Sequence, residues 1–168
     1  MLTLKQMTTE YQVNPVGIMQ RAPQFAWQFA KTRDRQTAYR IVVSKSRANA
    51  QDGVGEIWDS GTVQGKQCIG VRFAGEQLQS ATEYFWRLSV QNDKGVWTDS
   101  EVQTFETALF ERNDWKGAWT ALPLNFMGGS LRYRKILDLP ENKKIVKARA
   151  YVCGLGYHEF YVNGEKVV

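Results

Sequence analysis

The most reactive side chains in this sequence belong to two cysteines and one histidine, Cys68, Cys153 and His158. A structural zinc site of the usual Cys/His type needs four such ligands, so this chain alone cannot assemble one, and we expect no metal ion and no cofactor. Cys153 precedes His158 by five residues but lies in a strand-like segment, residues 148–153, where a small buried thiol is favoured over a nucleophile. A disulfide would have to join two separate parts of the chain, so both thiols are expected to be free.

Aromatic side chains are the second group with binding chemistry, because an aromatic face can stack against a sugar ring. Tyr84 and Trp86 could form such a platform, but they alternate with Phe85 and Arg87, as on a strand with one buried face, and core packing is favoured. The same alternation assigns Trp27 inward. Four tryptophans near turns or segment ends are expected to be partly exposed: Trp58, Trp97, Trp115 and Trp119. Carbohydrate-binding residues therefore stay unassigned.

The charge of the chain is modestly basic, with a formal net charge of +5 and a pI near 9.2. Residues 1–109 hold 12 basic and 11 acidic side chains, so the excess lies in residues 110–168, with 10 against 6. No nucleic-acid recognition motif accompanies it, and no apolar run is long enough to span a membrane, so neither partner is expected. Residues 1–10 lack the apolar region and cleavage site of a signal peptide, which favours a cytoplasmic location.

The elements that carry these side chains are short strands separated by turn residues. Apolar alternation over 4–10 residues, bounded by Gly, Asn, Asp and Ser, is typical of an antiparallel sandwich. Helical periodicity is confined to residues 46–50. The expected strands are residues 25–29, 39–43, 56–61, 67–73, 83–91 and 101–107. We therefore predict an all-β fold of immunoglobulin or fibronectin type III type over residues 10–109.

A tyrosine corner makes this prediction more specific. Tyr84 begins a strand, Leu88 lies further along its inward face, and Asn92 and Gly95 supply turn chemistry at its end. In such a corner, the tyrosine hydroxyl returns to a nearby backbone group and fixes a crossover of the sandwich. The segment resembles a fibronectin type III module, and the residues that carry the resemblance are Leu78, Thr82, Tyr84, Asn92 and Gly95.

A second unit begins after a connector at residues 110–116. Residues 117–168 predict the start of a second, jelly-roll-like sandwich, with strands near residues 131–139 and 145–153. Asn163 and Gly164 predict a tight hairpin turn near the end of the chain. This unit holds few strands, so we expect a truncated sandwich whose unpaired edges favour self-association through residues 117–168.

The order of six motifs resembles the N-terminal region of bacterial alpha-L-rhamnosidases. The motifs are NPVGI at 14–18, PQFAW at 23–27, QTAYRIVV at 36–43, WDSG at 58–61, YFWR at 84–87 and WKGAW at 115–119. Two further motifs, GLGY at 154–157 and FYVNG at 160–164, extend the resemblance into the next β-sandwich of that family. Ala26 and Thr120 depart from the usual residues, Ser and Ile, at positions without a chemical role.

The resemblance implies a parent enzyme that removes terminal alpha-L-rhamnose from glycosides with inversion, using an acidic pair in an (α/α)6 barrel downstream. Rhamnosylated glycosides would then be partners of a catalytic domain outside this chain. Glu159 and Glu165 flank the predicted hairpin turn, but residues on the solvent face of a ribbon are the favoured interpretation, and we assign no catalytic residue. The alternative is a non-enzymatic carbohydrate-binding or adhesion module of β-sandwich type.

Overall fold

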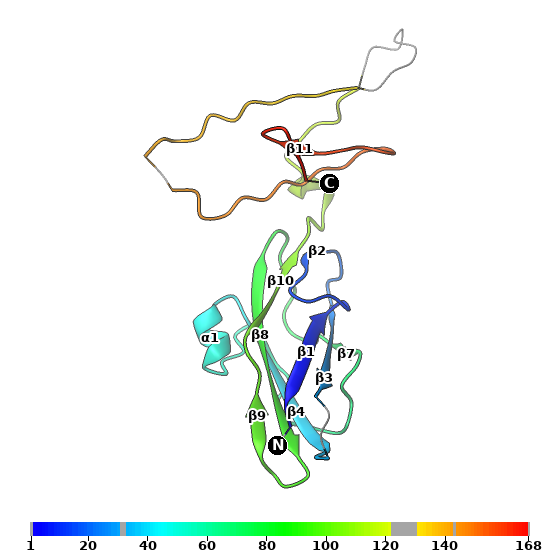
Figure 1. Cartoon of the computed structure of the whole chain (residues 1–168), viewed down its shortest axis with the longest axis vertical. Coiled ribbons are helices and arrows are strands. Elements are labelled where there is room, and N and C mark those ends of the chain that lie inside the picture. Colours follow the sequence, from blue (N-terminus) through cyan, green and yellow to red (C-terminus); the bar gives the residue numbers. More distant parts are fainter. Residues whose placement is uncertain (1, 31–32, 122–130, 143, 168) are drawn as a thin grey trace. The chain divides into compact units, whose positions relative to one another are not determined.

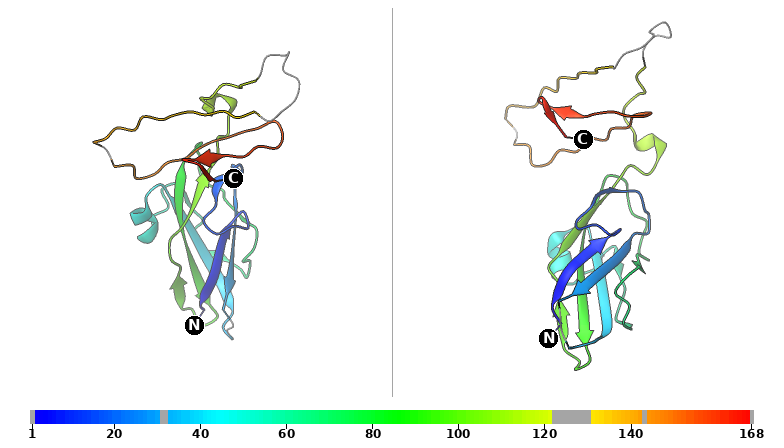
Figure 2. Two further views of the ribbon diagram at one scale, coloured as in Figure 1. Left: turned by 45° about the horizontal axis from the view of Figure 1, so that its top comes forward. Right: turned by 45° about the vertical axis from the view of Figure 1, so that its right-hand side comes forward.

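The first of two compact units is a sandwich of two β-sheets (Figures 1 and 2). The computed structural model describes residues 2–30, 33–121, 131–142 and 144–167, and the units are Met1–Thr120 and Ala121–Val168. One sheet has the order β1-β3-β7, and the other has the order β2-β10-β8-β4-β5, with β6 beside β4 and β9 beside β8. The strands are β1 (Leu4–Thr9), β2 (Val16–Ile18), β3 (Gln24–Phe29), β4 (Gln36–Ser44), β5 (Trp58–Asp59), β6 (Val63–Gln64), β7 (Val71–Arg72), β8 (Glu83–Asn92), β9 (Trp97–Asp99) and β10 (Gln103–Thr107).

The predicted all-β class and antiparallel pairing are confirmed, with one exception. Strand β2 pairs with β10 in parallel, and every other strand pair in these two sheets of the described chain is antiparallel. Strand β1, which lies before the predicted domain start at residue 10, was missed. Its residues, LKQMTT, place two polar side chains in succession at Lys5-Gln6 and again at Thr8-Thr9, so they lack a clean alternation.

An aromatic cluster between the sheets forms the core. The Phe25 ring lies 4.7 Å from that of Trp86 and 6.1 Å from that of Phe105, so β3 of one sheet contacts β8 and β10 of the other. Trp27 and Trp86 are buried, as the alternation predicts. The buried Trp27 indole donates to Gln36 Oε1 at 2.9 Å, and the Gln36 amide donates to two backbone carbonyls, so the polar atoms of this pair inside the sandwich are satisfied.

The predicted tyrosine corner is present. The Tyr84 hydroxyl accepts a hydrogen bond of 2.8 Å from the backbone N–H of Gln79, five residues upstream. The ring of Tyr84 stacks on Phe105 with centroids 5.3 Å apart, so the same side chain joins the crossover to the core. Asn92 closes the other end of β8, where its Oδ1 accepts hydrogen bonds from the N–H groups of Lys94 and Val96.

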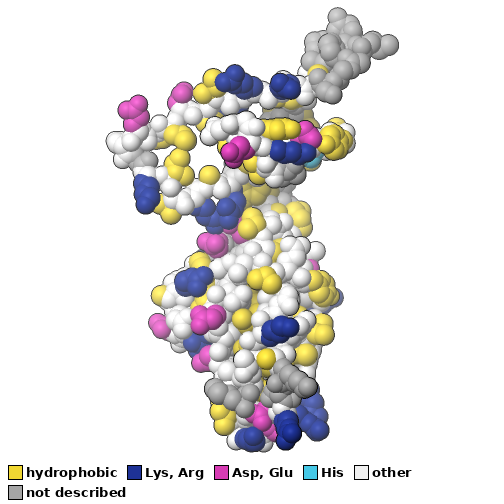
Figure 3. Space-filling view, viewed as in Figure 1, with side chains coloured by type: hydrophobic (Ala, Val, Ile, Leu, Met, Phe, Trp, Pro, Cys, Tyr) yellow, Lys and Arg dark blue, Asp and Glu magenta, His cyan; other side chains and the backbone are white. Residues whose placement is uncertain are grey.

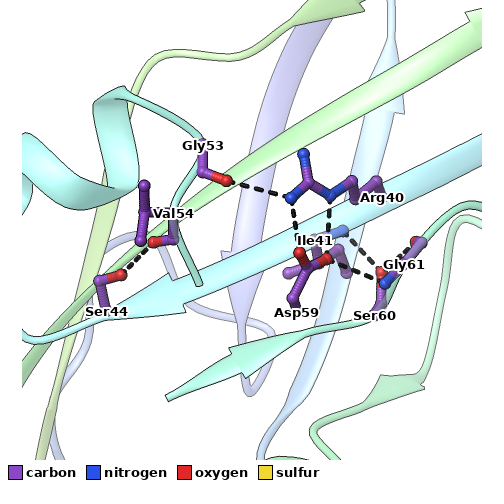
Figure 4. A network of polar contacts seen from close by, with 8 residues as sticks. All are labelled: Arg40, Ile41, Ser44, Gly53, Val54, Asp59, Ser60 and Gly61. Carbon is purple, nitrogen blue, oxygen red and sulfur yellow. Dashed lines mark hydrogen bonds and ion pairs between the residues drawn. The ribbon is translucent and has the colours of Figure 1, made fainter. Parts of the chain in front are cut away.

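The WDSG motif closes the edge of the larger sheet (Figure 4). Trp58 packs between Phe25 and Phe73 in the core, while Asp59 points outward to Arg40 on the adjacent strand. Ser60 pairs with the backbone of Ile41 through both its main chain and its hydroxyl. The motif therefore has a structural role, holding a short strand against β4.

One short helix packs on the outer face of the larger sheet. Helix α1 (Arg47–Gln51) covers part of β4 and β8, close to the predicted residues 46–50, and Ser46 caps its first turn. None of the helices in the described part of the chain is long and apolar enough to cross a bilayer.

The segment after β10 is fastened to the first unit. Asp114, in the short 3-10 helix η1 (Arg112–Asp114), accepts hydrogen bonds from the Ser80 hydroxyl and from the N–H of Glu111. The N–H of Phe110 donates to Ser80 Oγ at 3.0 Å, and the Arg21 guanidinium lies 4.6 Å above the Phe110 ring. We call this group the Ser80–Asp114 clamp. The predicted boundaries at residues 109, 116 and 117 stay predictions.

The second unit contains one hairpin among its described residues, formed by β11 (Tyr161–Val162) and β12 (Glu165–Lys166). Its turn residues Asn163 and Gly164 both have positive φ, of 51° and 88°, which suits the predicted tight turn. The strands predicted near residues 131–139 and 145–153 are wrong for the residues described there. A strand needs a hydrogen-bonded neighbour, and the alternation of these segments supplies none. Residues 122–130 and 143 lie outside the described residues.

The predicted burial of the Cys153 thiol is wrong. Cys153 is exposed rather than buried, because residues 148–153 do not pack as a strand, while Cys68 is partly buried against the core of the first unit. Both cysteines are free, as expected.

The tyrosine corner yields a stability prediction. Tyr84→Phe should lower the free energy of unfolding by about 1 kcal/mol, because it removes the hydroxyl and leaves the Gln79 N–H without its acceptor. Urea unfolding followed by tryptophan fluorescence measures this change. Tyr11→Phe is the matched control, since Tyr11 is 70% exposed, and equal stability of the two variants would contradict the role of the corner.

The Arg40–Asp59 pair predicts a pH dependence. Hydrogen bonds from Arg40 hold the pKa of the Asp59 carboxyl below its ordinary value, and the Gly61 N–H adds to this effect. A carboxyl with a lowered folded-state pKa stabilises the fold above its unfolded pKa of about 3.9, and this contribution is lost as the pH falls through the folded value.

Asp59→Asn should therefore flatten the loss of stability below about pH 4. Urea midpoints from pH 7 to pH 2.5 provide the measurement. Arg40→Gln should remove the same part of the slope, and an unchanged slope in both variants would show that the pair does not contribute.

Candidate functional site

The cysteine and histidine side chains do not form a reactive site. Among the described residues, no group of three or more His, Cys, Asp or Glu side chains could hold a metal ion. His158 Nδ1 lies 3.2 Å from the carbonyl oxygen of Gly156, and its ring packs closely over Gly154, where an added Cβ would lie 2.6 Å from Nδ1. The histidine is therefore held by the backbone of its own loop.

Glu159 and Glu165, the two glutamates beside the hairpin turn, lie in different environments. Glu159 accepts hydrogen bonds from Lys166 Nζ at 2.5 Å and from the hydroxyls of Tyr157 and Tyr161 at 2.7 Å each. Lys166 and the two tyrosines lower the pKa of Glu159 to about 2. A general acid needs a raised pKa to hold its proton near neutral pH, so Glu159 has the opposite property. Glu165 lies on β12, across the turn.

The six tryptophans divide as the strand alternation indicates. Trp27 and Trp86 belong to the core, and Trp58 is half-buried beside it. Trp97, Trp115 and Trp119 are exposed large apolar side chains. Trp97 lines a depression of the surface.

This depression, of about 360 Å³, lies on the outer face of β4, β8 and β9. We call it the Trp97 depression, and its lining residues are Arg40, Thr62, Arg87, Ser89, Trp97 and Asp99. Arg87 and Ser89 point outward because they alternate with the buried Trp86 and Leu88. Strand β9 pairs Asp99 with Ser89 and Trp97 with Gln91, which puts the indole and the carboxylate on the same outward face as Ser89.

The polar groups of the depression are paired with one another. Arg40 binds Asp59 through Nε, at 2.9 Å, and through Nη2, at 2.5 Å (Figure 4). Arg87 Nη2 lies 3.4 Å from Asp99, which also accepts a hydrogen bond of 2.5 Å from Ser89. Two cations therefore face two anions.

The backbone holds both arginines in place. Arg40 Nη2 donates to the Gly53 carbonyl at 3.1 Å, and Arg87 Nη1 donates to the Gln51 carbonyl at the end of α1. Arg87 Nε is buried and has no hydrogen-bond partner within the described structure. Side chains fixed in this way are arranged before any ligand arrives.

A second depression, of about 570 Å³, lies at the connector. Arg21, Ser80, Phe110, Glu111 and Asp114 line it together with residues 77–79 and Thr82. Its polar groups already serve the Ser80–Asp114 clamp, in which Ser80 holds the pKa of the Asp114 carboxyl below its ordinary value. This depression therefore has a structural role, because its polar side chains attach the segment after β10 to the sandwich.

Basic and acidic side chains are mixed on the face of the first unit that Figure 3 shows. Sequence reasoning identified Trp97 as exposed but missed Arg40, Arg87 and Asp99 beside it. The available signal was the outward position of Arg87, whereas the place of β9 next to β8 was not predicted.

Known proteins similar to this chain are alpha-L-rhamnosidases. An alpha-L-rhamnosidase from Formosa agariphila is 30% identical over 183 residues, covering 92% of this chain and 19% of that protein. An alpha-L-rhamnosidase from Alteromonas sp. is 26% identical and covers 92% of this chain and 18% of its own length. The chain thus spans about a fifth of the length of these relatives.

Solved structures give the same result. The alpha-L-rhamnosidase of Streptomyces avermitilis, complexed with L-rhamnose, aligns with a TM-score of 0.68 at 29% identity over 73% of this chain and 12% of its own. The enzyme of Dictyoglumus thermophilum aligns with a TM-score of 0.62 at 30% identity over 68% of this chain and 13% of its own. The predicted resemblance is confirmed. The family model described as the Rha78A-like, N-terminal immunoglobulin domain matches residues 4–111, and the chain therefore belongs to that family.

Proposed function

We propose that this chain is the non-catalytic N-terminal portion of an alpha-L-rhamnosidase, an enzyme that removes terminal alpha-L-rhamnose from glycosides. The observation that carries the proposal is the alignment of 92% of the chain with an alpha-L-rhamnosidase of which it spans 19%. Rhamnosylated glycosides would be bound by a catalytic domain in the remaining part of such a protein.

The finer part of the proposal concerns the reaction. Hydrolysis with inversion needs one carboxylic acid to protonate the leaving group and one carboxylate to activate water, about 6.5–9.5 Å apart. Glu159 does not suit the role of the acid, because its pKa is lowered to about 2. This supports a catalytic pair outside the chain and an inactive 168-residue protein.

The proposed contribution of this chain is to orient the following domain. The Ser80–Asp114 clamp fastens η1 to the sandwich, so the chain leaves the first unit from a fixed turn. Because the clamp fixes this turn, it would limit the orientations of the chain segment after η1.

The second candidate function is a non-enzymatic carbohydrate-binding module. One observation favours it, the exposed Trp97 indole within a depression lined by polar side chains. The two functions are compatible in one multidomain protein.

Self-association through residues 117–168 remains part of the proposal. Its support is the number of large apolar side chains that are exposed among the described residues of the second unit, including Ile136, Val146 and Leu155. Light scattering should give a mass above that of a monomer for the 168-residue chain and a monomer mass for a chain ending at Thr120. A strictly monomeric 168-residue protein would contradict it.

The enzymatic proposal predicts a division of activity. A full-length protein carrying this chain should release rhamnose from an aryl alpha-L-rhamnoside, and the first product seen by proton NMR should have the inverted anomeric configuration. The 168-residue chain should release none. Retention in the product would contradict inversion, turnover by the short chain would contradict its accessory role, and an inert full-length protein would contradict the enzymatic proposal.

A further inference from the structure

We propose that the Trp97 depression is a binding site for a neutral pyranose sugar, with the Trp97 indole as its stacking surface. The site belongs to the first unit alone; it rests on the second candidate function, carbohydrate binding, and does not depend on the activity of the parent protein.

The depression combines an apolar aromatic ring with charged and hydroxyl side chains. Trp97 is 39% exposed, and its neighbours in the lining are the guanidinium groups of Arg40 and Arg87, the carboxylate of Asp99 and two hydroxyls. A ligand that satisfies all of them must have an apolar face and also donors and acceptors at its edge. A pyranose has both, since its ring C–H groups lie between its hydroxyls.

The charges of the two arginines in the depression are balanced by carboxylates. Arg40 pairs with Asp59, and Arg87 pairs with Asp99, so the two cations are compensated by two anions. A phosphate or carboxylate ligand would have to compete with these carboxylates for the same guanidinium groups. A neutral ligand with hydroxyls can bind beside the pairs without separating them.

The Arg40 side chain is fixed by hydrogen bonds and still has N–H groups that a ligand can use. A guanidinium has five N–H donors, and Arg40 uses Nε and Nη2 for Asp59 and Gly53. In Figure 4, its other terminal nitrogen carries no bond to the residues drawn and points away from Asp59. Adjacent hydroxyls of a sugar could accept from such a group while Asp99 accepts from a hydroxyl.

The size of the depression favours a single sugar over a protein partner. Its volume of about 360 Å³ is at the lower end of the range for small-molecule sites. A specific protein interface would bury on the order of 800 Å² on each side and would have a larger apolar centre than one indole. Because the depression is open and has a single aromatic ring, we expect a dissociation constant in the millimolar range.

The test is an NMR titration of the uniformly 15N-labelled 168-residue chain. The probes are methyl alpha-L-rhamnopyranoside, methyl alpha-D-glucopyranoside and methyl beta-D-galactopyranoside, with inorganic phosphate as the charged comparison. We expect saturable shifts of the Trp97 indole N–H and of the Arg87 and Ser89 amides with at least one glycoside. No shift with any glycoside, or shifts with phosphate alone, would overturn the proposal.

Two variants locate the binding. Trp97→Ala should weaken the binding of the responding glycoside roughly tenfold, whereas Trp119→Ala should leave it unchanged. Trp97 is exposed on β9 and lies outside the buried core cluster, so its removal should preserve the amide spectrum of the sandwich. Equal affinity in the Trp97→Ala protein would overturn the site. The shift map of the unmodified chain tests the same point without any substitution, since shifts confined to residues away from the depression would also overturn it.

Discussion

Strand β8 has two faces, and the rest of the first unit depends on both. Its buried residues, Tyr84, Trp86, Leu88 and Val90, point into the sandwich, and the residues between them point outward. The strand also pairs with three neighbours, β4, β10 and β9. A shift of one residue in its register would move the buried Tyr84 and Trp86 to the solvent and the outward Arg87 and Ser89 into the core, so the pairing is strongly specified.

The inward face of β8 holds the two sheets together. Trp86 contacts Phe25 from the opposite sheet, and Tyr84 both stacks on Phe105 and bonds the backbone of Gln79. Burying each such side chain contributes about 1.5–3 kcal/mol, so a few aromatic contacts outweigh the individual surface ion pairs of the unit. The polar pairs on the outer face therefore position side chains more than they stabilise the fold.

The outward face of the same strand and the connector are the two parts that relate the fold to function. Arg87 and Ser89 form the floor of the Trp97 depression, and α1 supplies the carbonyl that holds Arg87. At the connector, Arg21 and the Ser80–Asp114 clamp hold the chain just after β10. The first unit thus carries both a depression on the outer face of its larger sheet and a clamp that holds the segment just after β10.

Local patterns in the sequence determined which side chains are buried in the first unit and where the tight turn of the second unit lies. A period of two specifies the face of each residue once a strand is formed, and Asn163-Gly164 specifies a tight turn through backbone conformations that few other residues adopt. The choice of neighbouring strands was decided by the tertiary structure, because pairing joins segments that are distant in the chain. This applies to β9 beside β8, which places Trp97 with Arg87, to the parallel pairing of β2 with β10, and to the connector that Ser80 holds from 34 residues upstream. It also explains Cys153, whose alternating segment predicted a buried strand but lies exposed, since alternation specifies a face only where a partner strand and a core exist to receive it.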